Sequence, residues 1–552
     1  MQKIGKSSAE SFRFRWDSSL EKMATATLQK SLGAFYTGKT VADRLVEWAI
    51  CDGSAAVLDP SCGDGAFLEA ANTRLVGLGS RSPQIYGVDV SADALRVAHE
   101  RVEVAHLIQK DFFNLTPDSL PSFDCVIGNP PFIRYQTFNG DKDTLGHQRA
   151  KEAGVDLPRL ASSWAPFVVH ASGFLRRGGR LAMVMPSELG HAMYARAVLR
   201  FLVENFRHLA VEMFRNKLFE DLSQSTVLLF CEGYGEPSRA FIVASSEGLF
   251  ASDRQVSKVD VATVKTGRFR FSPYLISKEA RSLYEGLAAD VRVQRLGEVA
   301  DIGIGYVTGA NDFFHLSAEE CRLWEIPKRF LRPCLPNLRG LEGIEYDQRQ
   351  WKERRARGDK AYLLALPQVS DDALPASLRR YLRNGEAEGL HLRYKCRIRQ
   401  FWYAVPHVRI ADAFLAYMSG EQPLLLVNTA NLVAPNTVHV LRFSRGHEPQ
   451  SYAASWRSSL TRLSCELEGH ALGGGLFKLE PSEAENVLVV CPRAALFATL
   501  KARLCEGTTK SAEYFSDITD RFVLRKQLGL SQADCLTLRE AAGTIESWRK
   551  HK

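Results

Sequence analysis

Phe123-Asp-Cys-Val-Ile-Gly-Asn-Pro-Pro-Phe132 is a short apolar run that ends abruptly in a polar side chain held between a glycine and two prolines. The run is partly β-branched and too short for a helix, which predicts a buried parallel strand. Pro130 and Pro131 fix φ and lack an N–H, so the strand has to stop before them. Open α/β sheets place their ligands at the carboxyl ends of such strands. We therefore expect Asn129 and Phe132 to grip a planar group that carries an amino nitrogen.

Strands and helices alternate around this stretch, from about residue 55 to about residue 230. We expect strands over residues 56–58, 85–88, 106–108 and 180–185, helices over 65–75, 92–101, 163–175 and 193–206, and a terminal hairpin from residues 208–213 and 226–230. The pattern predicts an α/β fold, a doubly wound and mostly parallel sheet that ends in an antiparallel hairpin. After residues 233–237 the alternation fades, and a mixed α+β domain with a C-terminal helical segment is expected.

Composition favours a globular protein of two or three domains. The chain has 552 residues, of which 45% are hydrophobic and 24% are charged, and these values exclude disordered and collagen-like proteins. We find no signal peptide and no apolar run long enough to span a membrane, so we expect a cytoplasmic protein. The 11 cysteines form no Cys-x-x-Cys pair, which predicts reduced thiols and no metal site. The net charge of +8 is compatible with a polyanionic partner.

A glycine-rich loop, Asp59-Pro-Ser-Cys-Gly-Asp-Gly-Ala-Phe67, follows the first expected strand. Such a loop lets the backbone approach a ligand closely, although it is also compatible with a structural tight turn. Asp89, at the end of the second strand, occupies the position that binds ribose in nucleoside-binding α/β proteins. Asp111 and Phe112 follow the third strand and suit an adenine, with a simple turn cap as the alternative for Asp111. Ligand-type residues at three successive strand ends favour a nucleoside site.

In this order, Asp59-Pro-x-Cys-Gly-x-Gly, Asp89, Asp111-Phe and Asn129-Pro-Pro-Phe resemble the S-adenosylmethionine-dependent DNA adenine-N6 methyltransferases. Ala34-Phe-Tyr-Thr37, upstream of the glycine loop, resembles the cofactor motif of the gamma class, which carries a long C-terminal recognition region. The resemblance implies a class I methyltransferase fold and the cofactor S-adenosyl-L-methionine. It also implies a lead-in over residues 1–30, a methyltransferase domain over 31–240 and a target-recognition domain over 241–552.

The same resemblance implies roles for individual residues. Cofactor contacts are implied for Tyr36, Thr37, Asp59, Cys62, Gly63, Asp89, Asp111 and Phe112. Asn129 and the Pro130 carbonyl would accept the two protons of the target amino group, and Phe132 would stack on the extruded base. Phe219 is the expected opposing ring. The family most often has tyrosine in place of Phe132, but stacking requires only the ring.

A basic segment in the C-terminal half has its own signal. Between His391 and Arg409 no acidic residue occurs, and cations alternate with the aromatic residues Tyr394, Phe401, Trp402 and Tyr403. Basic residues supply affinity for phosphates, while arginine and aromatic side chains read or stack on bases. The expected DNA-binding residues are Arg393, Lys395, Arg397 and Arg399. The alternative is a solvated basic face over a small aromatic core.

Double-stranded DNA is therefore the expected partner of a monomeric enzyme of a restriction–modification or phage-defence system, with room for a separately encoded cognate restriction endonuclease. A fused nuclease is not expected, because only about thirty residues precede the methyltransferase motifs. Asn-Pro-Pro-aromatic also occurs in methyltransferases that act on protein glutamine or on ribosomal RNA, but these are usually much shorter. A third alternative, a DNA-binding module without catalysis, predicts a damaged cofactor loop or a replaced Asn129, and both are intact.

Overall fold

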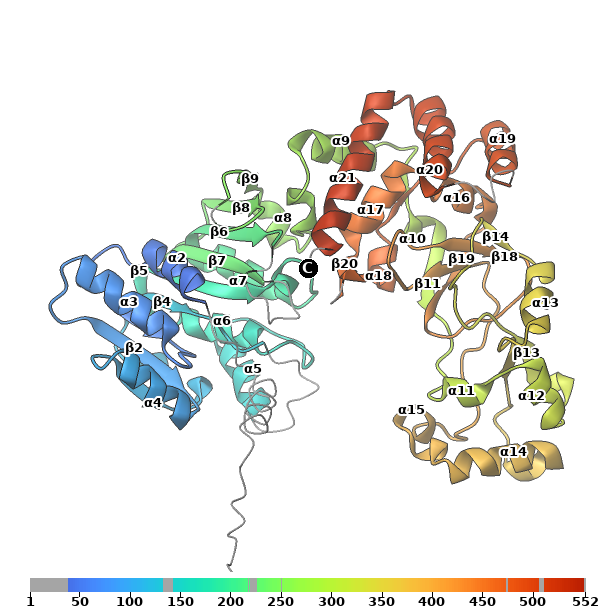
Figure 1. The fold of residues 1–552 in the computed structure, drawn as a ribbon, viewed down its shortest axis with the longest axis horizontal. Helices are drawn as coiled ribbons and strands as arrows, with labels where there is room; N and C mark the ends of the chain where they lie inside the picture. Colours follow the sequence, from blue (N-terminus) through green and yellow to red (C-terminus); the bar gives the residue numbers. More distant parts are fainter. Residues whose placement is uncertain are drawn as a thin grey trace, which may run out of the picture. The chain divides into compact units, whose positions relative to one another are not determined.

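A computed structural model describes residues 38–132, 142–216, 218, 226–249, 251–472, 475–505 and 511–550. The chain divides into two compact units, Met1–Arg270 and Phe271–Lys552, and each is described here by itself (Figure 1). None of the described helices is both long enough and apolar enough to cross a membrane.

The described part of unit 1 is built on a nine-stranded sheet with the order β3-β2-β1-β4-β5-β7-β6-β8-β9. The strands are β1 Ala56–Asp59, β2 Gln84–Asp89, β3 His106–Gln109, β4 Phe123–Gly128, β5 Leu175–Pro186, β6 Phe206–Phe214, β7 Thr226–Tyr234, β8 Ala240–Ser246 and β9 Gln255–Val259. The five neighbouring strands β3, β2, β1, β4 and β5 are parallel to one another, and β7 is antiparallel to both of its neighbours, β5 and β6. This arrangement confirms the predicted α/β fold with a mostly parallel first half and an antiparallel β6–β7 hairpin.

The helices of unit 1 are α2 Lys39–Ala49, α3 Ala66–Gly77, α4 Ala92–Arg101, α5 Lys142–Glu152, α6 Trp164–Ser172, α7 Ala195–Asn205 and α8 Val261–Lys265. Most of them lie against this sheet, and the other two, α5 and α8, contact a neighbouring helix. In α2 the buried positions Val41, Leu45 and Ala49 recur every four residues, which is the spacing of one helix face. These side chains share one core with strand residues such as Val57 and Ile127, so the helix is fixed against the strands that carry the candidate site.

The helix expected over residues 163–175 is shorter, and β5 begins earlier than expected. Helix α6 ends at Ser172, and Leu175 already pairs with Phe123 of β4. The next pairing joins Cys125 to Arg180, so residues 176–179 loop out of the sheet between two paired positions. Gly178 has φ +81°, a conformation that glycine adopts readily. Gly178 and its neighbour Gly179 therefore mark an irregularity within strand β5.

Two further strands follow the hairpin. Strand β8 lies parallel to β6, and β9 pairs with β8 in the antiparallel direction. No helix of the described chain separates β7 from β8, which is why the alternating pattern fades in the sequence while the sheet continues.

Unit 2 has several small sheets instead of one large one. Its described strands are β10 Gln294–Arg295, β11 Ala300–Ile304, β12 His315–Leu316, β13 Leu331–Pro333, β14 Glu345–Tyr346, β15 Tyr362–Leu364, β16 Ala413–Ala416, β17 Met418–Ser419, β18 Leu425–Asn428, β19 Val438–Phe443, β20 His470–Ala471, β21 Phe477–Lys478 and β22 Leu488–Val489. The largest described sheet has five strands in the order β11-β19-β16-β18-β14. Unit 2 is thus mixed α+β, as predicted.

Helices of unit 2 become frequent toward its C-terminal end. They are α9 Lys278–Ala288, α10 Leu296–Val299, α11 Asn311–Phe314, α12 Ala318–Leu323, α13 Gln348–Ala356, α14 Ala376–Ala387, α15 Tyr394–Arg397, α16 Pro449–Ser455, α17 Ser459–Glu468, α18 Pro481–Ala484, α19 Ala494–Cys505, α20 Ala512–Asp520, the π-helix η10 Arg521–Leu528 and α21 Gln532–Lys550. Buried apolar residues of α17 and α21, among them Leu460, Leu463 and Leu538, share a core with strands β11, β16 and β18. Helices α12 and α14 belong to a second core.

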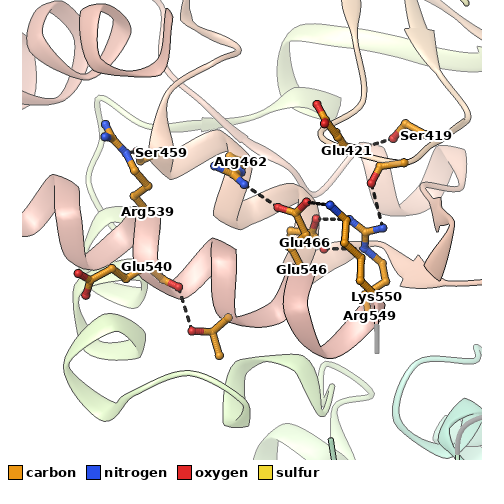
Figure 2. A network of polar contacts seen from close by, with 12 residues as sticks. Ser419, Glu421, Ser459, Arg462, Glu466, Arg539, Glu540, Glu546, Arg549 and Lys550 are labelled. Carbon is orange, nitrogen blue, oxygen red and sulfur yellow. Dashed lines mark hydrogen bonds and ion pairs between the residues drawn. The ribbon is translucent and has the colours of Figure 1, made fainter. Parts of the chain in front are cut away.

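A buried ion pair joins α17 to α21. Figure 2 shows Glu466 of α17 facing Arg549 of α21, with a shortest N–O distance of 2.9 Å. Each side chain is only 4% exposed. Arg549 also donates a hydrogen bond of 2.5 Å to the carbonyl of Gly475, while Arg462 pairs with Glu546 at 2.6 Å. The end of the last described helix is therefore fastened to the body of unit 2 by polar contacts as well as by its apolar face.

Candidate active site

Asn129 lies directly after β4, in the turn formed by Gly128-Asn-Pro-Pro131. Two serine hydroxyls fasten this turn at its backbone. Ser61 Oγ donates to the Asn129 carbonyl at 3.1 Å, and Ser163 Oγ donates to the Pro131 carbonyl at 2.5 Å. Neither proline has an N–H to offer, so these side chains supply the contacts that regular pairing cannot. The position of Asn129 is set jointly by the glycine loop and by the segment that precedes α6.

The glycine loop between β1 and α3 folds back onto the end of β2. The Cys62 N–H donates to the Val88 carbonyl at 2.9 Å, and the Gly63 N–H donates to Asp89 Oδ2 at 3.0 Å. Gly63 has φ +50°, which favours glycine at this point of the loop. The other carboxylate oxygen of Asp89 accepts a bond of 2.8 Å from the Ser91 N–H. The loop and Asp89 thus form one hydrogen-bonded unit at the carboxyl edge of the sheet.

Asp59, the last residue of β1, is completely buried. Its Oδ1 accepts a hydrogen bond of 3.1 Å from the Ser61 N–H, whereas Oδ2 has no hydrogen-bond partner among the described residues. Burial raises the pKa of this carboxyl group to about 8, because the charged form loses its hydration. A buried acceptor without a partner is costly to the folded protein. A cationic group bound at this position would relieve that cost.

Gly128 leaves room for Asp59. A Cβ on Gly128 would lie 2.8 Å from Asp59 Oδ1, closer than a real side chain tolerates. The carboxylate of the cofactor loop therefore packs directly against the backbone that carries Asn129. This contact brings the two predicted halves of the site, cofactor loop and Asn-Pro-Pro turn, together.

Asp111 and Phe112 have structural partners. Asp111 accepts a hydrogen bond of 3.1 Å from the Phe113 N–H and caps the short 3-10 helix η1 Phe112–Asn114. The Phe112 ring is 4% exposed and packs 5.0 Å, centroid to centroid, from Phe167 and from Phe174. The turn cap considered for Asp111 is present, and the adenine contacts of both residues stay predictions.

Three of the expected site residues, Tyr36, Thr37 and Phe219, lie outside the described residues. Phe132 is half-buried and packs against the apolar core of unit 1. Among the described residues no group of three or more His, Cys, Asp and Glu side chains could hold a metal ion.

Several polar residues near the site were not predicted from the sequence. Ser163 precedes Trp164, whose Nε1 donates to Tyr194 Oη at 3.2 Å, and the Tyr194 hydroxyl donates to Glu188 at 2.6 Å. Ser162 donates to the same carboxylate at 3.2 Å. This network involves the chain neighbours of Ser163 on both sides, Ser162 and Trp164, and so supports the residue that contacts Pro131. Its residues come from α6, η4 Ser187–Gly190 and the turn before α7, and no local motif in the sequence identifies them as one group.

The basic segment of unit 2 divides into two kinds of residue. Arg393, Lys395 and Arg397 are exposed, whereas Arg399 is half-buried. The Arg399 guanidinium donates to the carbonyl oxygens of Val307, Thr308 and Trp402 at 2.6, 2.8 and 3.1 Å. Tyr403 is buried and the Trp402 ring packs 5.5 Å from Phe313. The small aromatic core considered as an alternative is therefore present under a segment whose remaining cations face outward.

Two family models match the chain, one in each half. Residues 16–255 match N-6 DNA Methylase, and residues 269–524 match the C-terminal domain of the type II methyltransferase M.Eco57I. The chain is 20% identical to the type II methyltransferase M.AccI of Acinetobacter calcoaceticus, over 75% of this chain and 76% of the relative. It is 24% identical to M.HindII of Haemophilus influenzae, over 52% of this chain and 56% of the relative.

A solved structure shares the fold over nearly the whole chain. The type IIL restriction–modification enzyme MmeI in complex with DNA has a TM-score of 0.56 and 13% identity, and the alignment covers 95% of this chain and 77% of MmeI. The alternative of a protein-glutamine or ribosomal RNA methyltransferase finds no support in these matches. The fold, the glycine loop and the Asn-Pro-Pro turn agree with these matches: residues 16–255 and 269–524 each match a DNA methyltransferase family, and the N6-adenine DNA methyltransferases use S-adenosyl-L-methionine as their cofactor.

Proposed function

We propose that the chain is a site-specific, adenine-specific DNA methyltransferase of a restriction–modification or phage-defence system, with Asn129 at its catalytic centre. The observation that carries this assignment is the contact between Ser61 and the Asn129 carbonyl. It fastens the residue that orients the target nitrogen to the loop that binds the methyl donor. Positioning of two reactants is the main task in a direct transfer.

The residues present fit S-adenosyl-L-methionine. Asp59 has a buried carboxylate oxygen without a hydrogen-bond partner among the described residues. This oxygen would accept from the cationic amine of the methionine part of the cofactor, and Cys62 and Gly63 belong to the same loop. Asp89 would accept from the ribose hydroxyls, while Asp111 and Phe112 would hold the adenine. When bound, the cofactor supplies an electrophilic methyl group on a sulfonium sulfur.

Asn129 and Pro130 orient the target amino group. An exocyclic adenine nitrogen is a poor nucleophile because its lone pair is delocalised into the ring. The Asn129 side-chain oxygen and the Pro130 carbonyl would each accept one of its protons, which favours a localised lone pair directed at the methyl group. Direct in-line transfer needs no covalent enzyme intermediate. The buried Cys62 and Cys125, whose pKa values are raised by burial, accordingly have no role as nucleophiles.

The target base has to leave the DNA stack, since its amino group is unreachable inside a duplex. Extrusion costs a few kcal/mol, which stacking on aromatic side chains partly offsets. Phe132, next to the Asn-Pro-Pro turn, is the proposed stacking ring, and Phe219 is the proposed ring on the opposite side.

We assign catalysis to residues 31–240 and target recognition to residues 241–552, with residues 1–30 as a lead-in. The proposed partner is double-stranded DNA, bound by a monomer, and the proposed cognate restriction endonuclease is encoded separately.

Expression in a host without adenine methylation, followed by single-molecule sequencing of the host DNA, tests this function. We expect N6-methyladenine at one short sequence motif, and its absence with the Asn129→Ala variant. Methylated RNA or protein with unmodified DNA would refute the proposal. DNA from cells with the wild-type chain, but not DNA from cells with the Asn129→Ala variant, should resist the endonuclease that cuts this motif. A test with purified endonucleases would thus identify the matching restriction activity.

A further inference from the structure

Residues 392–398, the cationic segment, expose three large apolar side chains. Leu392, Tyr394 and Ile398 are 65%, 64% and 59% exposed. Tyr394 and Ile398 are four positions apart across α15, and the Ile398 N–H donates to the Tyr394 carbonyl at 3.3 Å, so the two side chains lie on the same side of this turn. Single exposed apolar residues are ordinary on a protein surface, but a group of them marks a contact surface.

Three cations alternate with these apolar residues. Arg393, Lys395 and Arg397 are exposed, and the Lys395 ammonium lies 5.5 Å from the centre of the Tyr394 ring. No Asp or Glu occurs between Gly389 and Arg409. The surface thus presents positive charge without internal neutralisation, which suits a polyanion.

The underside of the cationic segment is held rigidly. Cys396 is fully buried, and its Sγ contacts the Thr308 carbonyl at 3.6 Å. Gly309 approaches so closely that a Cβ there would lie 2.9 Å from Lys395 Cβ. Arg399 ties the end of the segment to the carbonyls of Val307 and Thr308. A surface loop that is fastened from below in this way can present its exposed side chains in a fixed arrangement.

We infer that the cationic segment contacts the duplex DNA substrate with two kinds of side chain, three cations and three apolar residues. Arg393, Lys395 and Arg397 bind phosphates, while Leu392, Tyr394 and Ile398 press against the bases, as apolar side chains do when they widen or unstack a step. Arg399 does not contact DNA; its hydrogen bonds to the carbonyls of Val307 and Thr308 hold the segment in place. This inference rests on the proposed DNA methyltransferase function and assigns part of its DNA surface.

Salt dependence separates the two sets. Binding of the full-length chain to a fluorescent mixed-sequence duplex is measured between about 50 and 200 mM salt. The triple variant Arg393→Gln, Lys395→Gln, Arg397→Gln should reduce the salt slope by about 0.9 for each phosphate that is no longer neutralised, or about 2.7 in total. The triple variant Leu392→Ser, Tyr394→Ser, Ile398→Ser should weaken binding about 10-fold with an unchanged slope, since stacking on bases is neutral.

Matched controls come from the other side of the same unit. Arg521, Arg525 and Lys526 are three exposed cations of η10, which follows α20 in the chain, and Figure 1 draws α20 and α15 at opposite ends of unit 2. Their replacement by glutamine changes the net charge equally and should leave the slope as in the wild type. Val291, Leu323 and Leu536, which are also exposed, serve as the serine control for the apolar set.

Equal reductions of slope in both cation triples would overturn the assignment, because the charge effect would then be general. If the triple serine variant of Leu392, Tyr394 and Ile398 bound DNA with wild-type affinity, the proposed base contacts would be wrong. These three side chains would then be assigned to a contact with a protein partner. Tyr394→Ser alone is the milder variant, and melting temperatures verify folding. Because binding is measured without methyl transfer, wild-type methylation together with unaltered binding of the variants would refute this inference and not the proposed function.

Discussion

The Ser61 hydroxyl donates a 3.1 Å hydrogen bond to the backbone carbonyl of Asn129. The neighbouring backbone N–H of Ser61 donates to Asp59. One residue of the glycine loop therefore contacts both the buried carboxylate proposed to bind the cofactor and the turn proposed to bind the target base. The two functions of the site are mechanically connected at Ser61.

Ser61→Ala should slow methyl transfer without weakening cofactor binding. The variant loses one hydrogen bond, worth about 1 kcal/mol, and retains the backbone contact with Asp59, so we expect kcat to fall about fivefold. Ser61→Thr keeps a hydroxyl and should recover much of the loss. Single-turnover methylation and binding of the non-reactive analogue sinefungin measure the two quantities. A loss of analogue affinity with unchanged kcat would show that Ser61 serves the cofactor alone.

Asn129→Ala should remove methyl transfer while leaving sinefungin affinity within a few-fold of the wild type. The variant deletes an acceptor that stabilises charge at the target nitrogen, and loss of one such group costs about 10²-fold or more in kcat. Asn129→Gln keeps the amide but displaces it, so we expect it to be nearly as inactive. Substantial turnover by either variant would remove Asn129 from the catalytic centre.

Cofactor affinity should increase with pH up to about pH 8. Burial raises the pKa of Asp59 to about 8, so the carboxyl group is mostly protonated at pH 6 and has to lose its proton before it can pair with a cationic amine. The affinity should gain at most tenfold per pH unit and level off where the amine itself deprotonates, at about 7.7–8.0. Isothermal titration with sinefungin from pH 6 to pH 8 measures this gain.

The Asp59→Asn variant is the control for this dependence. It should bind the analogue weakly and with little change between pH 6 and pH 8. Without ligand, the raised pKa of Asp59 predicts that stability is fully present below about pH 4 and is lost as pH rises toward 8. The variant should lack that part of the pH profile. A wild-type affinity that is flat over this range would show that Asp59 does not pair with the amine.

Local signals were sufficient to predict the strand ends of the site. Asp59, Asp89 and Asn129 each follow an apolar run with a recognisable stop, and parallel strands bring such ends to one edge of the sheet. Ser61 and Ser163 were not predicted, because a hydroxyl that bonds to a carbonyl 68 or 32 residues away leaves no periodic mark in the sequence. These contacts depend on the assembled fold.

The C-terminal half was predictable in composition but not in exposure. Residues 393–403 are rich in cations and aromatic residues, yet Tyr394 is exposed while Tyr403 is buried. Arg399 is only two positions from the exposed Arg397 but donates to three carbonyl oxygens. Which arginine is structural depends on residues 307 and 308, which approach from elsewhere in unit 2, so the composition of the segment alone could not separate structural from exposed cations.

The buried pair of Arg549 and Glu466 should make the end of α21 sensitive to single substitutions (Figure 2). Arg549→Met leaves an unpaired buried carboxylate and should lower the free energy of unfolding by about 3–5 kcal/mol. The double variant with Glu466→Leu removes both charges and should be more stable than Arg549→Met alone. Urea unfolding followed by tryptophan fluorescence measures the three free energies.

The loss in Arg549→Met should also depend on pH in a defined direction. Burial already raises the pKa of Glu466, and removal of the guanidinium raises it further, so the neutral carboxyl is tolerated at low pH and its ionisation destabilises the protein as pH rises. The loss of stability should therefore be smaller at about pH 5 than at about pH 8, because a buried carboxyl group with a raised pKa ionises between these two pH values. Arg349→Met breaks the exposed pair with Glu353 and should cost about 0–1 kcal/mol. A defect in Arg549→Met as small as this control, at both pH values, would mean that Glu466 gains water when its partner is removed and is not held in the core by α21.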